Sequence, residues 1–385
     1  MSEKDIPCLW EELKQYFNVG VAVPQYMIEN NMAEIEIVKK HFNQVVAENC
    51  TKMQYVYPEE DKFYWDEADS FIKFAKDNNK IVRWHTFVWH SQSPVWIFFD
   101  DYNPGEMPKF DPAKFDPEKF KKEKFDPSKF DFAKYDPVQA ALTHKLASKE
   151  QMEKRVQKYI QAVTDRYKGI ISSYDVVNEV ISDKRFNLRT RDDRSLWQEI
   201  MGPDYVEKAF FWARECDPNA ELVINDYNLE TIVEKRDGMY DAVKKMLSKG
   251  VPITTVGLQM HISMVSNPVK QIEEAIEKFA SLGVNVIVTE MDVSIHAHDD
   301  NDKEPKILTA ELLQKQADYY YDLFECFKRQ AKKGNLTDVV WWGVTDKFTW
   351  KNNFPVFGRG DAPLLFDTEG KIKPSFWSVC GKATN

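Results

Sequence analysis

The sequence predicts an α/β protein that folds as a closed (β/α)8 barrel with one insertion in the loop after its third strand. Short apolar runs alternate with amphipathic segments along almost the whole chain, which favours parallel strands joined by helices. Eight such runs within 385 residues suit a single barrel domain, 1–385. A doubly wound sheet is the alternative, but no glycine-rich phosphate-binding loop follows the first apolar run.

The eight predicted strands are rich in Val, Ile, Leu and aromatic residues, and most of them end in polar side chains. They span residues 17–23, 45–48, 81–86, 174–179, 222–226, 255–261, 286–290 and 339–344. The carboxyl ends of barrel strands carry the chemistry of such folds. We therefore expect the polar residues at these ends to form the functional site.

Two of the intervening segments show clear signals of where a helix begins. The segment 148–167 opens with a capping box of Ser148 and Gln151, followed by an apolar stripe at helical spacing. The segment 269–282 is predicted to begin at the N-cap Asn267, with a proline at the first helical position and a glycine after the last. Both helices would lie between predicted strands, as a barrel requires.

One segment, the predicted insertion 104–137, breaks this alternation. From Lys109 to Pro137 the pattern Lys-Phe-Asp-Pro recurs with a period of five residues, which fits neither a strand nor an α-helix. Its Asp-Pro steps favour tight turns. A solvated spacer is one interpretation, and a lid or partner surface made of its aromatic residues is the other. We expect a chain of short turns on the barrel rim or on a neighbouring subunit, without a catalytic group.

Composition and patterning argue against several classes of partner. A formal net charge of −10 argues against nucleic acid or an anionic membrane as the main partner. No run of about 18 apolar residues occurs, so we expect no membrane span. The first residues lack the basic and apolar regions of a signal peptide, which favours a cytoplasmic location. Assembly into a homo-oligomer is left open.

The cysteines and histidines predict neither a disulfide framework nor a metal site. Five cysteines are scattered without a Cys-x-x-Cys pair and are interpreted as reduced thiols. They are Cys8, Cys50, Cys216, Cys326 and Cys380. His296 and His298 lie in an acidic stretch that is typical of a solvated loop. We therefore expect no metal and no other cofactor.

Two of the predicted strands end in a glutamate, one in Glu179 and the other in Glu290. Because both ends would lie on the same face of a barrel, the two carboxyl groups can face each other across a substrate. Such a pair of carboxyl groups is typical of the active site of a glycoside hydrolase, in which one carboxyl group donates a proton and the other attacks the sugar or activates water. Two structural glutamates at strand ends would be the alternative.

Polar groups end seven consecutive predicted strands, as amides, imidazoles, carboxylates or indoles. The motifs are Glu48-Asn49-Cys50-Thr51-Lys52, His85-Thr86-Phe87-Val88-Trp89-His90-Ser91-Gln92, Asp175-Val176-Val177-Asn178-Glu179, Asn225-Asp226-Tyr227-Asn228, Gln259-Met260-His261, Thr289-Glu290-Met291-Asp292 and Trp341-Trp342-Gly343. One such end would mean little, but a ring of them is hard to explain as packing. The order and spacing of these motifs resemble glycoside hydrolase family 10 endo-1,4-β-xylanases over nearly the entire chain.

The resemblance implies a (β/α)8, or TIM, barrel that hydrolyses β-1,4-xylosidic bonds in xylan or xylo-oligosaccharides. The run Asn-Phe-Pro-Val at 353–356 and the missing signal peptide resemble the intracellular branch of the family. Trp84 stands where the family commonly has Gly, and Met291 stands where Leu is usual. The five-residue repeat matches no feature of the family. None of these departures removes a catalytic group.

By resemblance, Glu179 is the acid/base and Glu290 the nucleophile of a retaining double displacement. Retention requires the two carboxyl groups to lie about 5–5.5 Å apart. A negative charge on Glu290 favours the protonated, proton-donating form of Glu179. Formation of the glycosyl ester removes that charge, so Glu179 can then act as the base that activates water.

The resemblance also implies a set of sugar-binding residues at the strand ends. They are Glu48, Asn49, Lys52, His85, Trp89, Gln92, Asn178, Asn225, Tyr227, Gln259, His261, Trp342 and Trp350, with Asp292 orienting His261. Asn178 would donate to the 2-hydroxyl of the sugar in the −1 subsite. Gln92 and Trp350 would fill the space beside C5 that a hydroxymethyl group occupies in glucose. Asn225 and Tyr227 would face the aglycone.

Other classes of function stay open on the sequence alone. A barrel glycosidase acting on β-1,4-glucans would share the glutamate strand ends, although the motif from His85 to Gln92 favours a xylanase. A non-catalytic carbohydrate-binding protein would be expected to have lost one of the two glutamates. A metal-dependent barrel hydrolase would show His-x-His at the end of the first strand, which instead runs Val-Gly-Val-Ala-Val.

Overall fold

The structure is a computed structural model that describes residues 6–102 and 136–381. Most of the predicted insertion 104–137, including its repeat as far as residue 135, lies outside the described residues. The last Asp-Pro step is described, and its Asp136 carboxylate accepts a hydrogen bond from the Val138 backbone N–H at 2.9 Å. This step begins the short helix α7 (Pro137–Ala140), as an Asp cap before Pro favours.

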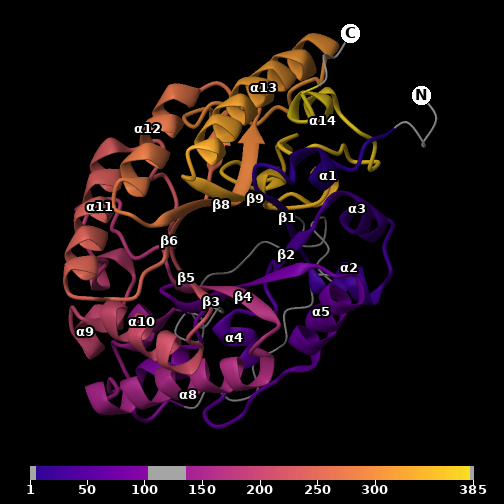
Figure 1. The fold of residues 1–385 in the computed structure, drawn as a ribbon. Coiled ribbons are helices and arrows are strands. Elements are labelled where there is room, and N and C mark those ends of the chain that lie inside the picture. The colour runs from indigo at the N-terminus through magenta and orange to yellow at the C-terminus, as the bar shows by residue number, and fades with distance from the viewer. Residues whose placement is uncertain (1–5, 103–135, 382–385) are drawn as a thin grey trace.

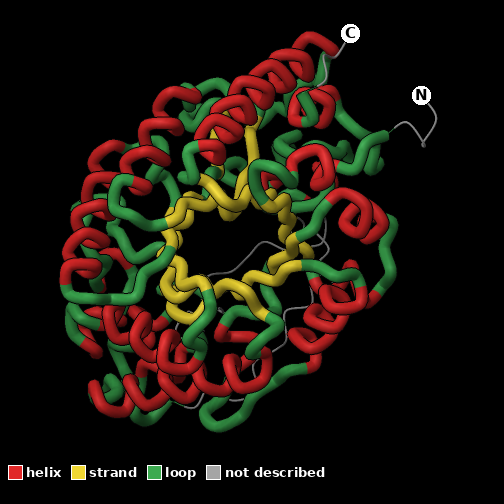
Figure 2. The backbone as a smooth tube through the Cα atoms, in the orientation of Figure 1, coloured by secondary structure: helices red, strands yellow, loops and turns green. Residues whose placement is uncertain are grey.

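Parallel strands close into a barrel, which confirms the predicted fold class (Figure 2). The strands are β1 (Asn18–Val23), β2 (Gln44–Ala47), β3 (Ile81–Trp89), β4 (Ile171–Asn178), β5 (Glu221–Asp226), β6 (Thr255–Leu258), β7 (His261–Ser263), β8 (Asn285–Ser294) and β9 (Leu336–Trp341). β1 pairs with both β2 and β9, and β6 pairs with β8, so the ring is complete. The predicted strand 255–261 is divided into β6 and β7, with Met260 between them at a φ of 62°.

Helices surround the ring of strands on the outside (Figure 1). They are α1 (Leu9–Leu13), α2 (Gln25–Glu29), α3 (Glu34–His41), α4 (Met53–Val56), α5 (Asp66–Asp77), α7, α8 (Lys149–Tyr167), α9 (Trp197–Met201), α10 (Tyr205–Cys216), α11 (Val233–Ser248), α12 (Val269–Ala280), α13 (Ala310–Lys332) and α14 (Pro374–Val379). Apolar side chains from these helices and from the outward faces of the strands form one continuous core. The layers are those of an α/β barrel.

The two predicted helix starts have different outcomes. At α8 the capping box is confirmed, because the Ser148 hydroxyl accepts from the Gln151 N–H at 3.2 Å and the Gln151 side chain accepts from the Ser148 N–H at 3.4 Å. At α12 the predicted N-cap Asn267 is wrong, since Pro268 holds that position. The Asn267 amide oxygen instead accepts from the Ser263 N–H at 2.7 Å, so it serves the preceding turn.

The interior of the barrel carries buried polar groups as well as apolar ones. Arg83, with none of its surface exposed, donates to the Thr289 carbonyl oxygen at 2.8 Å and pairs with Asp175 at 3.4 Å. Gly257 has a particular role, because a Cβ atom at that position would lie 2.5 Å from the Asn225 amide oxygen. Glycine on β6 therefore leaves room for an asparagine that reaches the catalytic face of the barrel.

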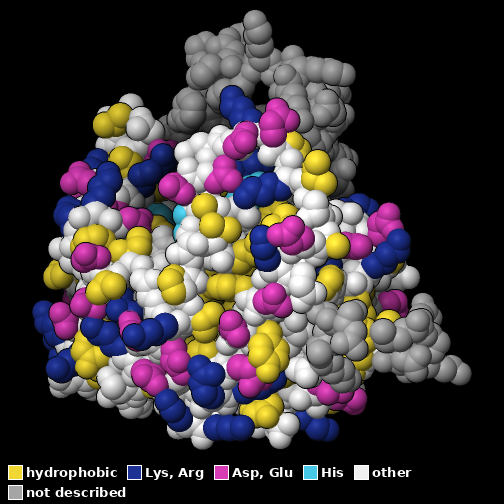
Figure 3. All heavy atoms as spheres, turned by 90° about the horizontal axis from the view of Figure 1, so that it is seen from above, with side chains coloured by type: hydrophobic (Ala, Val, Ile, Leu, Met, Phe, Trp, Pro, Cys, Tyr) yellow, Lys and Arg dark blue, Asp and Glu magenta, His cyan; other side chains and the backbone are white. Residues whose placement is uncertain are grey.

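The surface carries both signs of charge. Acidic and basic side chains are interspersed across the face drawn in Figure 3, rather than gathered into one patch there. Within the described residues, no helix combines the length and the apolar character that crossing a bilayer requires.

Candidate active site

Glu290 lies on β8 and faces the catalytic end of the barrel, with only 4% of its surface exposed. Its Oε2 atom is 3.3 Å from the His261 Nε2 atom, and its Oε1 atom accepts a hydrogen bond from the Asn225 amide at 2.8 Å. Burial by itself would raise the pKa of Glu290, but the hydrogen bond from His261 and the neighbouring cationic side chains lower it to about 2. Glu290 is therefore ionised at any pH near neutrality.

His261 lies between Glu290 and a second carboxylate, Asp292. The His261 Nδ1 atom is 2.8 Å from the Asp292 Oδ2 atom, which also accepts from the Trp350 indole N–H at 2.9 Å. Burial would lower the pKa of His261, yet Asp292 and Glu290 raise it to about 9. The ring is thus an imidazolium held between two carboxylates, and it presents a fixed positive charge to Glu290.

Glu179 directly follows β4, and its carboxyl group is held by different donors. The Trp89 indole N–H donates to its Oε2 atom at 2.8 Å, and the Gln259 amide donates to its Oε1 atom at 3.1 Å. The His90 Nε2 atom is 4.0 Å from Oε2. Burial, together with the charge on Arg189, lowers the pKa of His90 to about 4, so this imidazole is neutral. The carboxyl group of Glu179 therefore has neutral groups as its nearest side-chain neighbours.

A chain of amides connects the two glutamates. The Gln259 amide that donates to Glu179 also donates to the Asn178 amide oxygen at 3.3 Å. The Asn225 amide donates to that same oxygen at 2.8 Å and to Glu290 at 2.8 Å. Both carboxyl groups therefore belong to one hydrogen-bonded cluster. Their separation of about 5–5.5 Å stays a prediction.

Lys52 anchors the opposite wall of the site. Its ammonium group donates to the Asn49 side chain at 2.9 Å and to the Gln92 side chain at 2.7 Å. It also lies 5.1 Å from the ring centre of Trp89 and 6.0 Å from that of Trp342. Burial lowers the pKa of Lys52 to about 8. The contact with Trp89 joins this wall to Glu179.

His85 completes the same wall. Its Nδ1 atom is 2.7 Å from the Asp175 carboxylate, and its ring centre is 5.4 Å from that of Trp342. Because Asp175 engages Nδ1, the other ring nitrogen is left for a ligand. Glu48 lies beside Asn49, whose amide approaches it at 3.5 Å. Burial raises the pKa of Glu48.

Tyr227 is joined to Glu179 through the side chain of Arg189. Its hydroxyl group donates to Asp183. The same hydroxyl accepts from the Arg189 guanidinium at 2.7 Å. The same guanidinium donates to the Glu179 carbonyl oxygen at 2.7 Å. All residues that the sequence nominated for the site are thus joined by contacts, and their individual roles stay predictions.

The family model of glycosyl hydrolase family 10 matches residues 8–112 and 137–382. The chain belongs to glycosyl hydrolase family 10. Endo-1,4-beta-xylanase C of Paenibacillus barcinonensis is 40% identical to it over 390 residues, which cover 99% of this chain and 32% of that protein. Endo-1,4-beta-xylanase B of the same organism is 36% identical over 98% of this chain and 99% of its own length.

Solved structures of the family agree with these relatives. The structure of the intracellular xylanase TsXylA from Thermoanaerobacterium saccharolyticum, in complex with xylotriose, is 36% identical with a TM-score of 0.78. The aligned region covers 98% of this chain and 99% of the TsXylA chain. This family 10 chain spans about a third of the length of several curated relatives that it matches. Most of the five-residue repeat falls between the two matched ranges.

The two departures from the usual family 10 pattern noted in the sequence, Trp84 and Met291, belong to the apolar core. Trp84 is fully buried and packs on the Tyr167 ring of α8, with ring centres 5.4 Å apart. Met291 is also fully buried, directly after Glu290 on β8, where alternate side chains point to opposite faces. Both residues therefore fill the layer between strands and helices.

Sequence reasoning missed four residues that support this family 10 site. They are Asp175, behind His85, and the group Asp183, Arg189 and Lys235 around Tyr227. Asp175 stands within a quoted motif and could have been found from its place on a strand facing the barrel interior. The other three lie in a loop and on α11, where charged residues are usually solvated, so the sequence offers no signal for the burial of Arg189 and Lys235 or for their pairing with Asp183.

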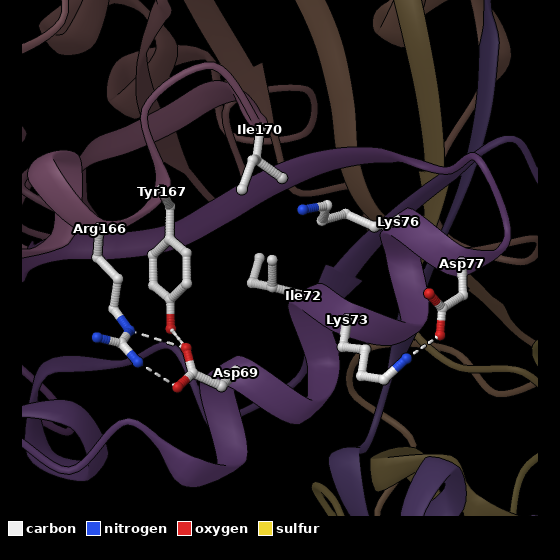
Figure 4. Close-up of a pocket in the computed structure, with 8 residues that line it drawn as sticks. All are labelled: Asp69, Ile72, Lys73, Lys76, Asp77, Arg166, Tyr167 and Ile170. Atoms are coloured by element: carbon white, nitrogen blue, oxygen red, sulfur yellow. Dashed lines mark hydrogen bonds and ion pairs between the residues drawn. The ribbon is translucent and has the colours of Figure 1, made fainter.

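A separate hollow lies on the outer wall, between α5 and the end of α8 (Figure 4). It encloses about 540 Å³. Its charged side chains largely pair with one another, as Asp69 does with Arg166 and Lys73 with Asp77. It contains none of the strand-end residues, so we assign the family 10 chemistry to the barrel end alone.

Proposed function

We propose that this chain is an endo-acting β-1,4-xylanase that cleaves xylan or xylo-oligosaccharides with retention of configuration. The observation that carries the proposal is the pair Glu179 and Glu290, which belong to one hydrogen-bonded cluster but have different neighbours: an imidazolium lies beside Glu290, and an indole and an amide lie beside Glu179. The endo-1,4-beta-xylanases of Paenibacillus barcinonensis, which are similar to the chain over almost all of its length, support the choice of substrate.

In the first step, ionised Glu290 attacks the anomeric carbon of the sugar in the −1 subsite and forms a glycosyl ester. The bond from that carbon to the bridging oxygen breaks, and Glu179 donates its proton to the leaving oxygen. The cation on His261 and the amide of Asn225 keep Glu290 charged and oriented until it attacks.

In the second step, Glu179 takes a proton from a water molecule, which attacks the same carbon and releases Glu290 as a carboxylate. Two inversions at one carbon give net retention. The Asn178 Nδ2 group is buried and has no hydrogen-bond partner among the described residues. We assign this donor to the 2-hydroxyl of the sugar, a contact that strengthens in the transition state.

Preference for xylose over glucose follows from the side chains expected beside C5. Gln92 is fixed by Lys52 at 2.7 Å, and the Trp350 indole is fixed by Asp292 at 2.9 Å. Because hydrogen bonds restrain both side chains, neither can move aside freely to admit a hydroxymethyl group. An aryl xylobioside should therefore be cleaved much faster than the matching aryl cellobioside, and equal rates would favour a β-1,4-glucanase instead.

The direct test of the retaining mechanism is the configuration of the first product. Proton NMR of freshly cleaved aryl xylobioside should show the β-anomer before mutarotation. With Glu179→Ala and added azide, the product should be the β-xylobiosyl azide, because azide replaces activated water on the same face of the ester. An α-configured first product would contradict the assignment of Glu290 as the nucleophile.

We also propose that the protein acts in the cytoplasm on xylo-oligosaccharides. The similarity to an enzyme described as an intracellular xylanase supports this location. Immunoblotting of the host's cytoplasmic and secreted fractions tests it. Recovery of the protein mainly outside the cell would overturn the proposed location but would leave the proposed chemistry intact.

A further inference from the structure

The side chain of Arg189 contacts three other residues at the site, namely Glu179, Tyr227 and Asp183. It lies in the loop after β4 and has only 6% of its surface exposed. Its Nε group donates to the Glu179 carbonyl oxygen at 2.7 Å, and its Nη2 group donates to the Tyr227 hydroxyl at 2.7 Å and to Asp183 at 3.1 Å. A planar guanidinium holds such partners in fixed relative directions, which an ammonium group cannot do.

The backbone of Glu179 requires such support. Its φ is 55°, in the left-handed region that residues with side chains adopt only when their surroundings hold them there. The Glu179 N–H donates to the Asn225 carbonyl oxygen at 2.8 Å, and the Glu179 carbonyl oxygen accepts from Arg189. With both backbone groups fixed, the side chain is aimed at Trp89 and Gln259.

An ion-pair network, buried except at the partly exposed Asp183, in turn fixes Arg189. The Lys235 ammonium, with no surface exposed, contacts Asp183 at 2.8 Å and Asp226 at 2.9 Å. Asp226 also accepts from the Ile181 N–H at 3.0 Å, at the start of the loop that carries Arg189. The two cations and two carboxylates alternate, so each buried charge has a partner of opposite sign.

We infer that Arg189 is a positioning residue for proton transfer by Glu179, and this inference rests on the proposed function. Arg189 holds the backbone of the acid and the aglycone-facing Tyr227 in one ion-paired frame. None of the hydrogen bonds or ion pairs of its side chain reaches Glu290. Disturbing Arg189 therefore impairs protonation of the leaving oxygen while leaving nucleophilic attack intact.

The test compares leaving groups that differ in their need for a proton. Arg189→Lys keeps the charge but cannot reach all three partners. Its kcat/KM, which reports steps up to formation of the ester, should fall about 100-fold on xylotetraose and less than about threefold on dinitrophenyl xylobioside. A variant damaged only in its general structure would lose activity on both substrates alike.

Arg191→Lys is the matched control in the same loop. The Arg191 guanidinium pairs with Glu199 at 2.7 Å at the surface and makes no hydrogen bond or ion pair with Glu179 in the described structure. Both of its rates should stay within about twofold of wild type, because exposed ion pairs contribute little. Parallel losses of Arg189→Lys on both substrates, or no loss on either, would overturn the inference.

If Arg189→Lys fails to fold by circular dichroism, Asp183→Asn provides the same readout. It removes one charged partner of Arg189, so kcat/KM should fall less than in Arg189→Lys, and again only on xylotetraose. An equal loss on both substrates, or no loss on either, would count against the inference. Failure of the proposed function has a different signature. Wild-type protein would then cleave neither xylotetraose nor dinitrophenyl xylobioside, so the two failures are distinguishable.

Discussion

Glu290 and Glu179 both present a carboxyl group to the active site, but their surroundings differ. Glu290 sits within strand β8, its side chain 6% exposed, beside an imidazolium that keeps it charged. Glu179 follows its strand in a left-handed conformation, its side chain 15% exposed, and its carboxyl group accepts from an indole and an amide. The contrast teaches that two residues of the same type can be suited to the two proposed roles, nucleophile and acid, by the charge of their neighbours.

Replacing either glutamate should have the largest effect on kcat/KM, and the two replacements should differ in how the loss depends on the leaving group. Glu290→Ala should lower kcat/KM by about five orders of magnitude on dinitrophenyl xylobioside and on xylotetraose, since no leaving group replaces a nucleophile. Glu179→Ala should lower it about 10²–10⁴-fold on xylotetraose but far less on dinitrophenyl xylobioside, whose leaving group needs no proton. Steady-state kinetics on the two substrates measure this, and equal losses in the Glu179 variant would contradict the assigned roles.

Removing the cation beside Glu290 should have the next largest effect. His261→Gln keeps a polar side chain but loses the positive charge, so kcat/KM should fall about 100-fold on both substrates. The uniform loss would set His261 apart from Arg189, whose effect depends on the leaving group. His298→Gln is a control, because the His298 Nε2 atom contacts the Asn267 side chain at 2.8 Å. A loss confined to xylotetraose would place His261 with the acid instead.

Trimming Trp350 should have a smaller and different effect, on the choice of sugar. Trp350→Ala opens space beside C5, and the ratio of rates on aryl xylobioside and aryl cellobioside should fall about tenfold. Both absolute rates should also decline, since the indole N–H that orients Asp292 is lost. Competition between the two substrates in one reaction measures the ratio directly. An unchanged ratio would exclude Trp350 as the residue that rejects glucose.

The smallest expected effect is on the pH dependence of stability. Against the effect of burial, Asp292 and Glu290 raise the pKa of His261 from 6.5 to about 9, so its stabilisation is complete below pH 6.5 and is lost as the pH rises through about 9. Despite burial, the pKa of Glu290 falls from 4.5 to about 2, so its stabilisation is present above pH 4.5 and is lost toward pH 2.

The difference in Tm between wild type and His261→Gln should therefore be largest between pH 4.5 and 6.5 and shrink as the pH rises toward 9. Calorimetry at a series of pH values measures it. A difference that stays constant over this range would mean that His261 stabilises the protein by packing rather than by its charge.

Much of the fold was predictable because apolar runs and strand ends are local signals. The barrel needs parallel strands, and its polar residues gather where the strands end, so Glu179 and Glu290 could be named in advance. The failures have local causes too. The turn at Met260 depends on a positive φ that methionine rarely adopts. The predicted N-cap Asn267 was wrong because its amide oxygen accepts from the Ser263 N–H, which precedes it in the chain.

The supporting residues were less predictable than the strand ends, for a physical reason. Arg189 and Lys235 carry charges that are usually solvated, and nothing in their neighbouring sequence differs from a surface segment. Their burial arises only when the loop after β4 meets α11, where Asp183 pairs with both cations and Asp226 pairs with Lys235. Such alternation of charges is a property of the folded chain, which spacing along the sequence does not encode.

The left-handed backbone of Glu179 also bears on how far evolution has optimised this protein. A residue with a side chain costs about 1–3 kcal/mol in that conformation, and glycine avoids most of this cost. Glu179→Gly should therefore melt at a higher temperature than Glu179→Ala, although both lack the same carboxyl group. The chain therefore carries glutamate where the backbone alone would favour glycine. At this position it gives up stability for a carboxyl group, the group to which we assign proton transfer.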